Sequence, residues 1–163
     1  MKTLNRFYEA KRSWGSEYVV LVVPQYYMVK LLKINKFAKG GLQYHHLKNE
    51  CGLVLHGSLQ VTILKDGVYT TKTLVKNNIF HFEPGLIHQE SAEEDTIILE
   101  MSTPHFNDRV RLDHEDLPEN TLLSTEINDV LYLDSLKDVN SIRSYGFKEI
   151  SAESIPFLHY ISF

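Results

Sequence analysis

A succession of short β-type segments, separated by turn residues, most constrains the fold of this chain. Between residues 17 and 102, runs rich in valine, isoleucine, leucine and tyrosine alternate with turn signals such as Asp66-Gly67 and Pro84-Gly85. The expected strands span residues 18–23, 26–34, 51–56, 59–64, 68–74, 79–82, 86–90 and 96–102, with a further strand carrying Gln43 and His45. Many short strands at near-regular spacing indicate an all-β sandwich or barrel.

The two ends of the chain lack this regular succession of short strands and turns. Residues 5–12 could form one short helix. In the tail, we expect a short strand at 130–133 and a helix that begins at Asp134 or Ser135 and ends at Tyr145-Gly146.

Length and composition exclude several classes of protein. At 163 residues and 43% hydrophobic content, the chain can build one packed domain. The formal net charge is −4 and no basic stripe is present, which argues against nucleic acid as a partner. Cys51 is the only cysteine, so neither an intramolecular disulfide nor a thiolate zinc site is expected. The apolar runs are far shorter than the ~20 residues of a membrane span, so we expect no membrane partner and a cytoplasmic location.

The stretch from Leu42 to Gly57 gathers polar side chains of metal-binding type. In a strand, alternation places Gln43 and His45 on one face, and Glu50 opens the next strand. A second contribution comes from His88, which follows the Pro84-Gly85 turn. Gln43, His45, Glu50 and His88 form a mixed nitrogen and oxygen set suited to zinc, manganese, iron or nickel.

The spacing alone leaves a simpler reading open. A single histidine in a strand is usually a satisfied polar residue, and the four side chains could be the polar face of a sandwich. Alternation turns His46 away from Gln43 and His45.

These residues resemble a known family. The pattern Gln43-x-His45-x4-Glu50-x6-Gly57, followed by Pro84-Gly85-x2-His88, resembles the two motifs of the cupin superfamily. The Gln-x-His form is similar to the cupin domain (type II mannose-6-phosphate isomerase) of mannose-1-phosphate guanylyltransferase/mannose-6-phosphate isomerase. Further similar segments are Arg12-Ser13-Trp14-Gly15, residues 27–30, residues 94–104 and residues 108–112. The chain departs from the pattern at Leu47, where a histidine is usual, at Lys48, where an arginine is usual, and in lacking the terminal Gly-Arg.

The resemblance implies an all-β double-stranded β-helix, or jelly roll, with a metal in the barrel mouth. The expected division is a cupin domain at 1–118 and a short mixed C-terminal extension at 119–163, packed on the barrel or at a dimer interface. A homodimer is the expectation from the family.

The resemblance also implies a metal-dependent sugar-phosphate isomerase that interconverts an aldose and a ketose. Zinc is the first choice of metal, with manganese, iron or nickel as alternatives. Lys48 and Arg111 are candidate phosphate contacts, although Lys48 could be a plain turn lysine and Arg111 could pair with an acidic neighbour. Glu83 or Glu90 could act as the base, although a solvent-exposed carboxylate is the better interpretation of each. The alternatives are a non-catalytic small-molecule or carbohydrate-binding cupin and a metal-dependent oxygenase.

Overall fold

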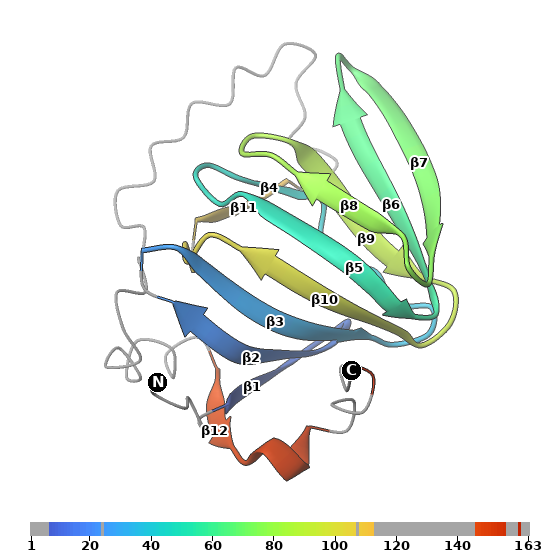
Figure 1. The fold of residues 1–163 in the computed structure, drawn as a ribbon. Coiled ribbons are helices and arrows are strands. Elements are labelled where there is room, and N and C mark those ends of the chain that lie inside the picture. Colours follow the sequence, from blue (N-terminus) through green and yellow to red (C-terminus); the bar gives the residue numbers. More distant parts are fainter. Residues whose placement is uncertain (1–6, 24, 107, 113–145, 156–159, 161–163) are drawn as a thin grey trace.

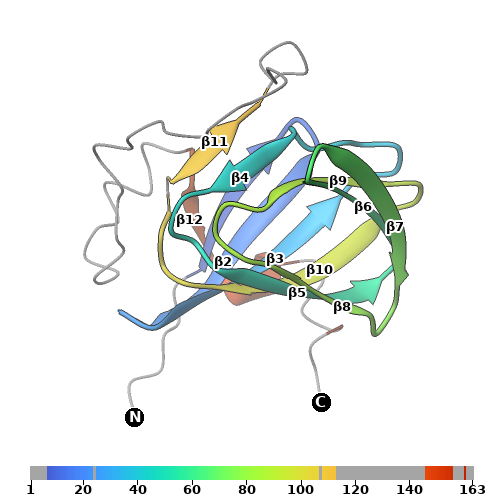
Figure 2. The same ribbon diagram turned by 90° about the horizontal axis from the view of Figure 1, so that it is seen from above.

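Two antiparallel sheets enclose the interior of the protein in the computed structural model (Figure 1). The structure describes residues 7–23, 25–106, 108–112, 146–155 and 160. Viewed from above, the strands curve around a central space, with β11 and β4 side by side at its rim (Figure 2).

The larger sheet has seven strands in the order β12-β1-β2-β3-β10-β5-β8. Their bounds are Phe7–Arg12 (β1), Gly15–Val23 (β2), Tyr27–Ile34 (β3), Glu50–His56 (β5), Ile79–Phe82 (β8), Thr96–Ser102 (β10) and Lys148–Ile150 (β12). The smaller sheet has five strands in the order β11-β4-β9-β6-β7. Their bounds are Gln43–His45 (β4), Ser58–Lys65 (β6), Val68–Val75 (β7), Ile87–Ala92 (β9) and Arg109–Arg111 (β11). This arrangement confirms the predicted all-β jelly roll.

Alternation along the strands divides apolar side chains between the interior and the outer faces. The principal core lies between the sheets and consists of Leu32, Ile34, Val54, Leu59, Val61, Phe82, Ala92 and Ile98. A second cluster covers the outside of the smaller sheet and contains Leu42, Tyr44, Ile87 and Leu112. The inward positions of the short strands β4 and β11 are therefore left to polar residues.

The described part of the C-terminal segment packs on the larger sheet. Strand β12 pairs with β1, and the following 3-10 helix (Ala152–Ser154) leads into Ile155, which is buried against Tyr18 and Leu31. The extension thus covers part of the sheet's outer face, while its predicted boundary at residue 119 stays a prediction.

The expectations for the two ends have different outcomes. A helix at residues 5–12 is wrong, because Phe7–Arg12 forms β1 and pairs with β2 on one side and β12 on the other. Tyr8 and Ala10 alternate inward along this strand, a period-two pattern that the short segment already contained. The strand predicted at 130–133 and the helix predicted to begin at Asp134 or Ser135 lie outside the described residues.

Turn chemistry behaves as the sequence predicts. Asp66 and Gly67 have φ of 52° and 76° and connect β6 to β7, as an Asp-Gly hairpin turn requires. Gly57 has φ of 81°, and a Cβ there would lie 2.5 Å from the carbonyl oxygen of Asp95, so the turn leaves no room for a side chain.

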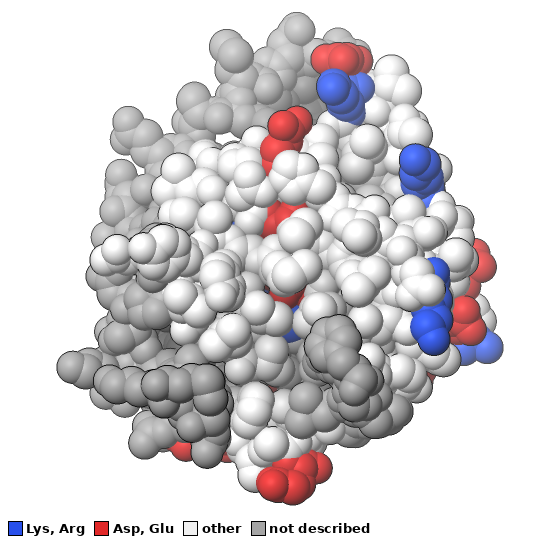
Figure 3. All heavy atoms as spheres, viewed as in Figure 1, with Lys and Arg blue, Asp and Glu red and all other residues white. Residues whose placement is uncertain are grey.

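On the face in Figure 3, Lys and Arg gather along the edge formed by β6 and β7, while most of the face is uncharged. Among the described residues, no helix has the length and apolar character needed to cross a membrane.

Candidate metal centre

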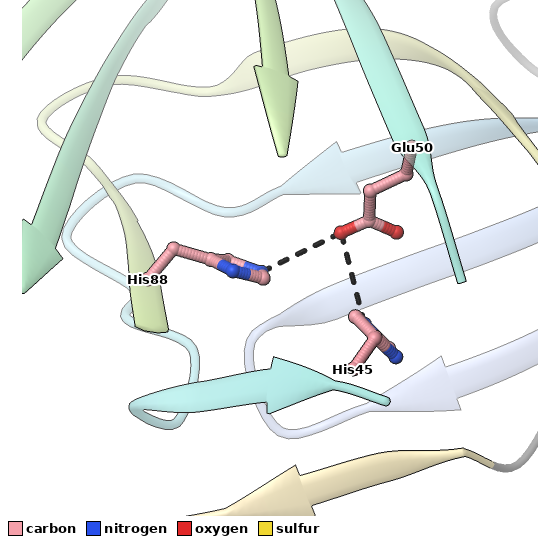
Figure 4. A group of neighbouring side chains, drawn as sticks. All are labelled: His45, Glu50 and His88. Atoms are coloured by element: carbon pink, nitrogen blue, oxygen red, sulfur yellow. Dashed lines mark ion pairs between the residues drawn. The ribbon is translucent and has the colours of Figure 1, made fainter. Parts of the chain in front are cut away.

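Three buried side chains from both sheets converge at one point inside the barrel. His45 ends β4, His88 lies near the start of β9, and Glu50 begins β5 in the opposite sheet. Glu50 Oε1 lies 3.5 Å from His88 Nε2 and 3.7 Å from His45 Nε2. Figure 4 shows both imidazoles approaching the same carboxylate oxygen of Glu50.

The spacing of these atoms fits a divalent metal. Ligand atoms bound at about 2.0–2.2 Å with angles between octahedral and tetrahedral lie about 2.8–3.6 Å apart. The ligand atoms of His45, Glu50 and His88 all lie within 4.8 Å of one another, so small side-chain shifts would close them around one ion. Two imidazoles and a carboxylate suit first-row metals.

Hydrogen bonds set both imidazoles in the ligand form. His88 Nδ1 donates to the carbonyl oxygen of Leu86 at 3.0 Å, and His45 Nδ1 donates to Asp108 Oδ1 at 2.9 Å. Each Nε2 therefore carries its lone pair toward Glu50. Burial lowers the pKa of His88, which favours the neutral ring that a metal requires.

Asp108 is the second-layer residue that the sequence reasoning missed. It is fully buried, and its Oδ2 accepts hydrogen bonds from the backbone N–H groups of Leu47 and Lys48 at 2.8 and 2.6 Å. Burial acts to raise the pKa of Asp108, but the hydrogen bond from His45 and those from the backbone outweigh it, so the net pKa is lowered. Asp108 therefore fixes both the tautomer and the orientation of His45.

Replacing Asp108 by asparagine should weaken metal binding about 10- to 100-fold, the usual cost of losing such an outer partner. The amide keeps the size of the side chain but removes the charge and can present its NH2 group to His45. Metal affinity measured by competition with a chromophoric chelator tests this expectation. An unchanged affinity in a folded variant would show that Asp108 does not orient the ligand.

Gln43 lies beside the triad with its amide nitrogen inward. It is the cross-strand partner of His88, and the distance from Gln43 Nε2 to His88 Nε2 is 3.4 Å. Rotation of the Gln43 amide by about 180° would turn Oε1 toward the triad in place of Nε2. Which of the two atoms faces inward is determined by the hydrogen bonds that the amide makes. The four predicted ligands thus meet in one place, and Gln43 needs this rotation to join the other three.

His46 lies on the other face, as alternation predicts. Its ring contacts Tyr44, with 5.1 Å between the ring centroids, and Tyr44 belongs to the outer apolar cluster. Leu47, where the family usually has a histidine, is 52% exposed and points into solvent.

Lys48 is buried between two carboxylates. Its ammonium pairs with Glu50 Oε2 and with Glu100 Oε1, the latter at 2.8 Å. Burial acts to lower the pKa of Lys48, but the charges of Glu100 and Glu50 raise it above its usual range. Lys48 is therefore a buried cation paired with two carboxylates and not a plain turn lysine.

Alternating charges continue from Lys48 across the inner face of the larger sheet. Glu100 lies 3.8 Å from Lys30, which lies 3.2 Å from Glu17, and Glu17 also pairs with Arg12. Burial acts to raise the pKa of Glu100, but Lys30 and Lys48 lower it well below its usual range. One signal in the sequence could have revealed this network. Lys30 and Glu100 occupy inward positions of β3 and β10, where the neighbouring inward residues, such as Leu32 and Ile98, are apolar.

These side chains line a cavity of about 280 Å³. Its polar wall includes Gln43, His45, Glu50, Glu90, Arg109 and Arg111, and its apolar wall includes Trp14, Phe80 and Phe106. The volume is at the small end of ligand pockets, which typically span ~300–1,000 Å³.

The two carboxylates considered as a base have different positions. Glu83 is exposed, as expected. Glu90 is half-buried and lines the cavity, so the interpretation as a solvent-exposed carboxylate is wrong for it. Burial, together with the negative charges of Glu50 and Glu100, raises the pKa of Glu90 to about 8. Glu90 follows His88 by two residues in β9, so both side chains lie on the inward face of the strand.

Arg111 and its neighbour Arg109 stand at the cavity rim. In the register of β11 against β4, Arg111 is opposite Gln43 and Arg109 is opposite His45. Both arginines line the cavity and remain open to solvent. The predicted phosphate contact Arg111 is therefore near the predicted ligands, and Arg109 is a second cation that the sequence reasoning did not single out.

Comparisons with known proteins support the fold. No protein-family model matches the chain, and no curated protein matches it. Among solved structures, the capsular polysaccharide assembling protein CapF from Staphylococcus aureus is similar, with 17% identity and a TM-score of 0.58 over 64% of this chain and 34% of that one. Oxalate decarboxylase from Bacillus subtilis is similar with 19% identity and a TM-score of 0.59, over 69% of this chain and 33% of that one. The chain thus has the cupin jelly-roll fold and spans about a third of the length of these structures.

Proposed function

We propose that this chain is a metal-dependent cupin that acts on a small sugar phosphate and catalyses an aldose–ketose isomerisation. The observation that carries the proposal is the buried His45–Glu50–His88 triad, of which His45 and Glu50 line a cavity that also holds a further carboxylate and arginine side chains. The similar solved structures are named for different activities, so the proposal depends on the residues of the site and not on the fold.

His45, Glu50 and His88 would hold the ion, with Gln43 as a fourth ligand after rotation of its amide. Zinc fits this set, and manganese, iron or nickel are the alternatives. When bound, the metal would act as a Lewis acid that polarises the oxygen atoms of the substrate. Because Nδ1 of each histidine is engaged, both Nε2 atoms are available without a change of tautomer.

Glu90 is the best-placed side chain to move the proton between adjacent carbons. Glu17, Glu50 and Glu100 also line the cavity, but each pairs with a cation. No ion pair is recorded for Glu90 within the described residues. In the proposed reaction, its carboxylate takes the proton from carbon 2 of the aldose and returns it to carbon 1 of the enediol, while the proton of the carbon 2 hydroxyl passes to the oxygen on carbon 1.

The proposal is tested by incubating metal-loaded protein with mannose 6-phosphate and following fructose 6-phosphate by NMR. We expect interconversion that a chelator abolishes and that Glu90→Gln reduces at least about 100-fold, the lower range of a general base's contribution. Glu83→Gln is the matched control, because Glu83 is exposed, and it should retain full activity. Absence of isomerisation across a panel of aldose and ketose phosphates, with metal bound, would refute the proposal.

A second candidate is a non-catalytic carbohydrate-binding cupin. The observation that favours it is the engagement of Lys48 by Glu50 and Glu100, which occupies one of the two predicted phosphate contacts. Stoichiometric binding of a sugar phosphate without turnover in the same experiment would support this candidate.

A further inference from the structure

Strand β11 directs two arginines into the cavity mouth. Cross-strand partners share a face of the sheet, so Arg109 and Arg111 face the same side as His45 and Gln43. The intervening Val110 faces the opposite side and packs against the outer cluster that contains Tyr44. The strand thus places two guanidinium groups on the cavity side and uses one apolar residue to anchor itself.

Within the described residues, neither Arg109 nor Arg111 has a direct ion-pair partner, although the charges of Glu17 and Glu50 act on Arg109 from a longer distance. The pKa of Arg109 is lowered by burial against the cavity wall and then by the charge of Arg111. Two neighbouring cations in a partly enclosed place repel each other, and an anion bound between them would remove that cost.

The other cations of the cavity are already neutralised. Lys48 contacts Glu50 and Glu100, Lys30 contacts Glu17, and Arg12 also contacts Glu17. An incoming anion would have to break a buried pair to use any of them, which is costly. The two rim arginines need no such exchange.

We propose that Arg109 and Arg111 form a clamp for a phosphate group, and that this clamp selects phosphorylated ligands for the cavity. The inference rests on the proposed function and specifies the ligand contact within it. Arg109 takes the role of second phosphate contact that the sequence suggested for Lys48. Arg109 is opposite His45 in the strand register, whereas Lys48 is already paired with Glu50 and Glu100.

The number of donors favours phosphate over carboxylate. One guanidinium satisfies both oxygens of a carboxylate in a bidentate pair. Two guanidinium groups match a dianion with three terminal oxygens, such as a phosphate monoester. Arg109 and Arg111 are directly opposite His45 and Gln43, and such cross-strand partners have Cβ atoms about 4.5–5.5 Å apart, so a phosphate held by the arginines would lie close to the metal-binding side chains.

Titration calorimetry with inorganic phosphate tests the clamp directly. Chelator-treated protein is used, so that phosphate cannot bind to a metal. We expect Arg109→Gln and Arg111→Gln each to weaken phosphate affinity about 10- to 100-fold, the range for one lost charged hydrogen-bonding partner. Arg111→Lys should lose less phosphate affinity than Arg111→Gln, since lysine keeps the positive charge but not the bidentate guanidinium geometry.

Two controls make the result specific. Lys72→Gln removes the same charge from the exposed strand β7 and should leave the affinity within about 2-fold, as expected for a distant screened charge. Acetate should compete poorly with phosphate. Unchanged affinity in both folded glutamine variants, or acetate that binds as tightly as phosphate, would overturn the clamp.

The outcome is separable from that of the proposed function. Phosphate binding that depends on both arginines, without any isomerisation, would refute the isomerase and keep the clamp. Isomerisation that is insensitive to Arg109→Gln and Arg111→Gln would refute the clamp and keep the isomerase.

Discussion

Replacing His88 by alanine should lower the affinity of the chain for divalent metal by at least about 100-fold, more than the loss of an outer hydrogen-bond partner. His88 supplies one of the three convergent donors, and its Nε2 lies 3.5 Å from Glu50 Oε1. No other described histidine lies near enough to take its place. His46 lies on the opposite face, and His56 is exposed at the far end of β5. His81 and His105 are hydrogen-bonded to Asn49 and Thr103. His45→Ala should have an effect of similar size.

The measurement is metal content by elemental analysis together with affinity from chelator competition. His46→Ala is the matched control, since it removes an imidazole from the neighbouring position without touching the triad. Circular dichroism would verify that each variant folds. Equal metal content in the native chain and in both triad variants would contradict the assignment of the site.

Replacing Lys48 by methionine should cost about 3–5 kcal/mol of unfolding free energy in the metal-free protein, as expected when one partner of a buried ion pair is removed. Methionine fills much of the space but leaves Glu50 and Glu100 facing each other without the cation that lies between them. The two carboxylates are each 7% exposed, so water cannot compensate for the lost partner.

Chemical denaturation monitored by fluorescence measures this loss. Lys65→Met is the control, because Lys65 is exposed at the end of β6 and should change stability by less than about 0.5 kcal/mol. Adding Glu100→Gln to Lys48→Met should recover part of the loss, since it removes one of the two carboxylate charges that repel each other once Lys48 is gone. An unfolding free energy of Lys48→Met within about 1 kcal/mol of the native value would contradict the role of Lys48 as an internal counter-ion, because a loss that small is typical of an exposed ion pair.

The sequence predicts much of the fold because its local signals agree with one another. Asp66-Gly67 makes the hairpin turn that its residue types require, and alternation separates Gln43 and His45 from Tyr44 and His46. The segment Phe7–Arg12 fails as a prediction because its strand character comes from partners on both sides. Tyr8 and Ala10 do alternate in this segment, but a period-two pattern of six residues is too short to exclude a helix by itself.

The parts of the site that escape prediction depend on contacts between distant residues. Asp108 reaches His45 across 63 positions of the chain, and nothing beside Asp108 in the sequence indicates that contact. Glu100 and Lys48 are 52 positions apart and meet only because β10 and β5 are paired. Residue types suggested the candidate metal ligands, whereas the groups that orient and neutralise them follow from the topology of the two sheets.

Anomalous diffraction from crystals grown with zinc tests the central claim most directly. Maps calculated at the zinc absorption edge should show one strong peak inside the barrel, between Nε2 of His45, Nε2 of His88 and the carboxylate of Glu50. Gln43 should then present its amide oxygen to the same peak. A barrel interior without such a peak, with zinc found only at surface positions such as His81 or His105, would contradict the account.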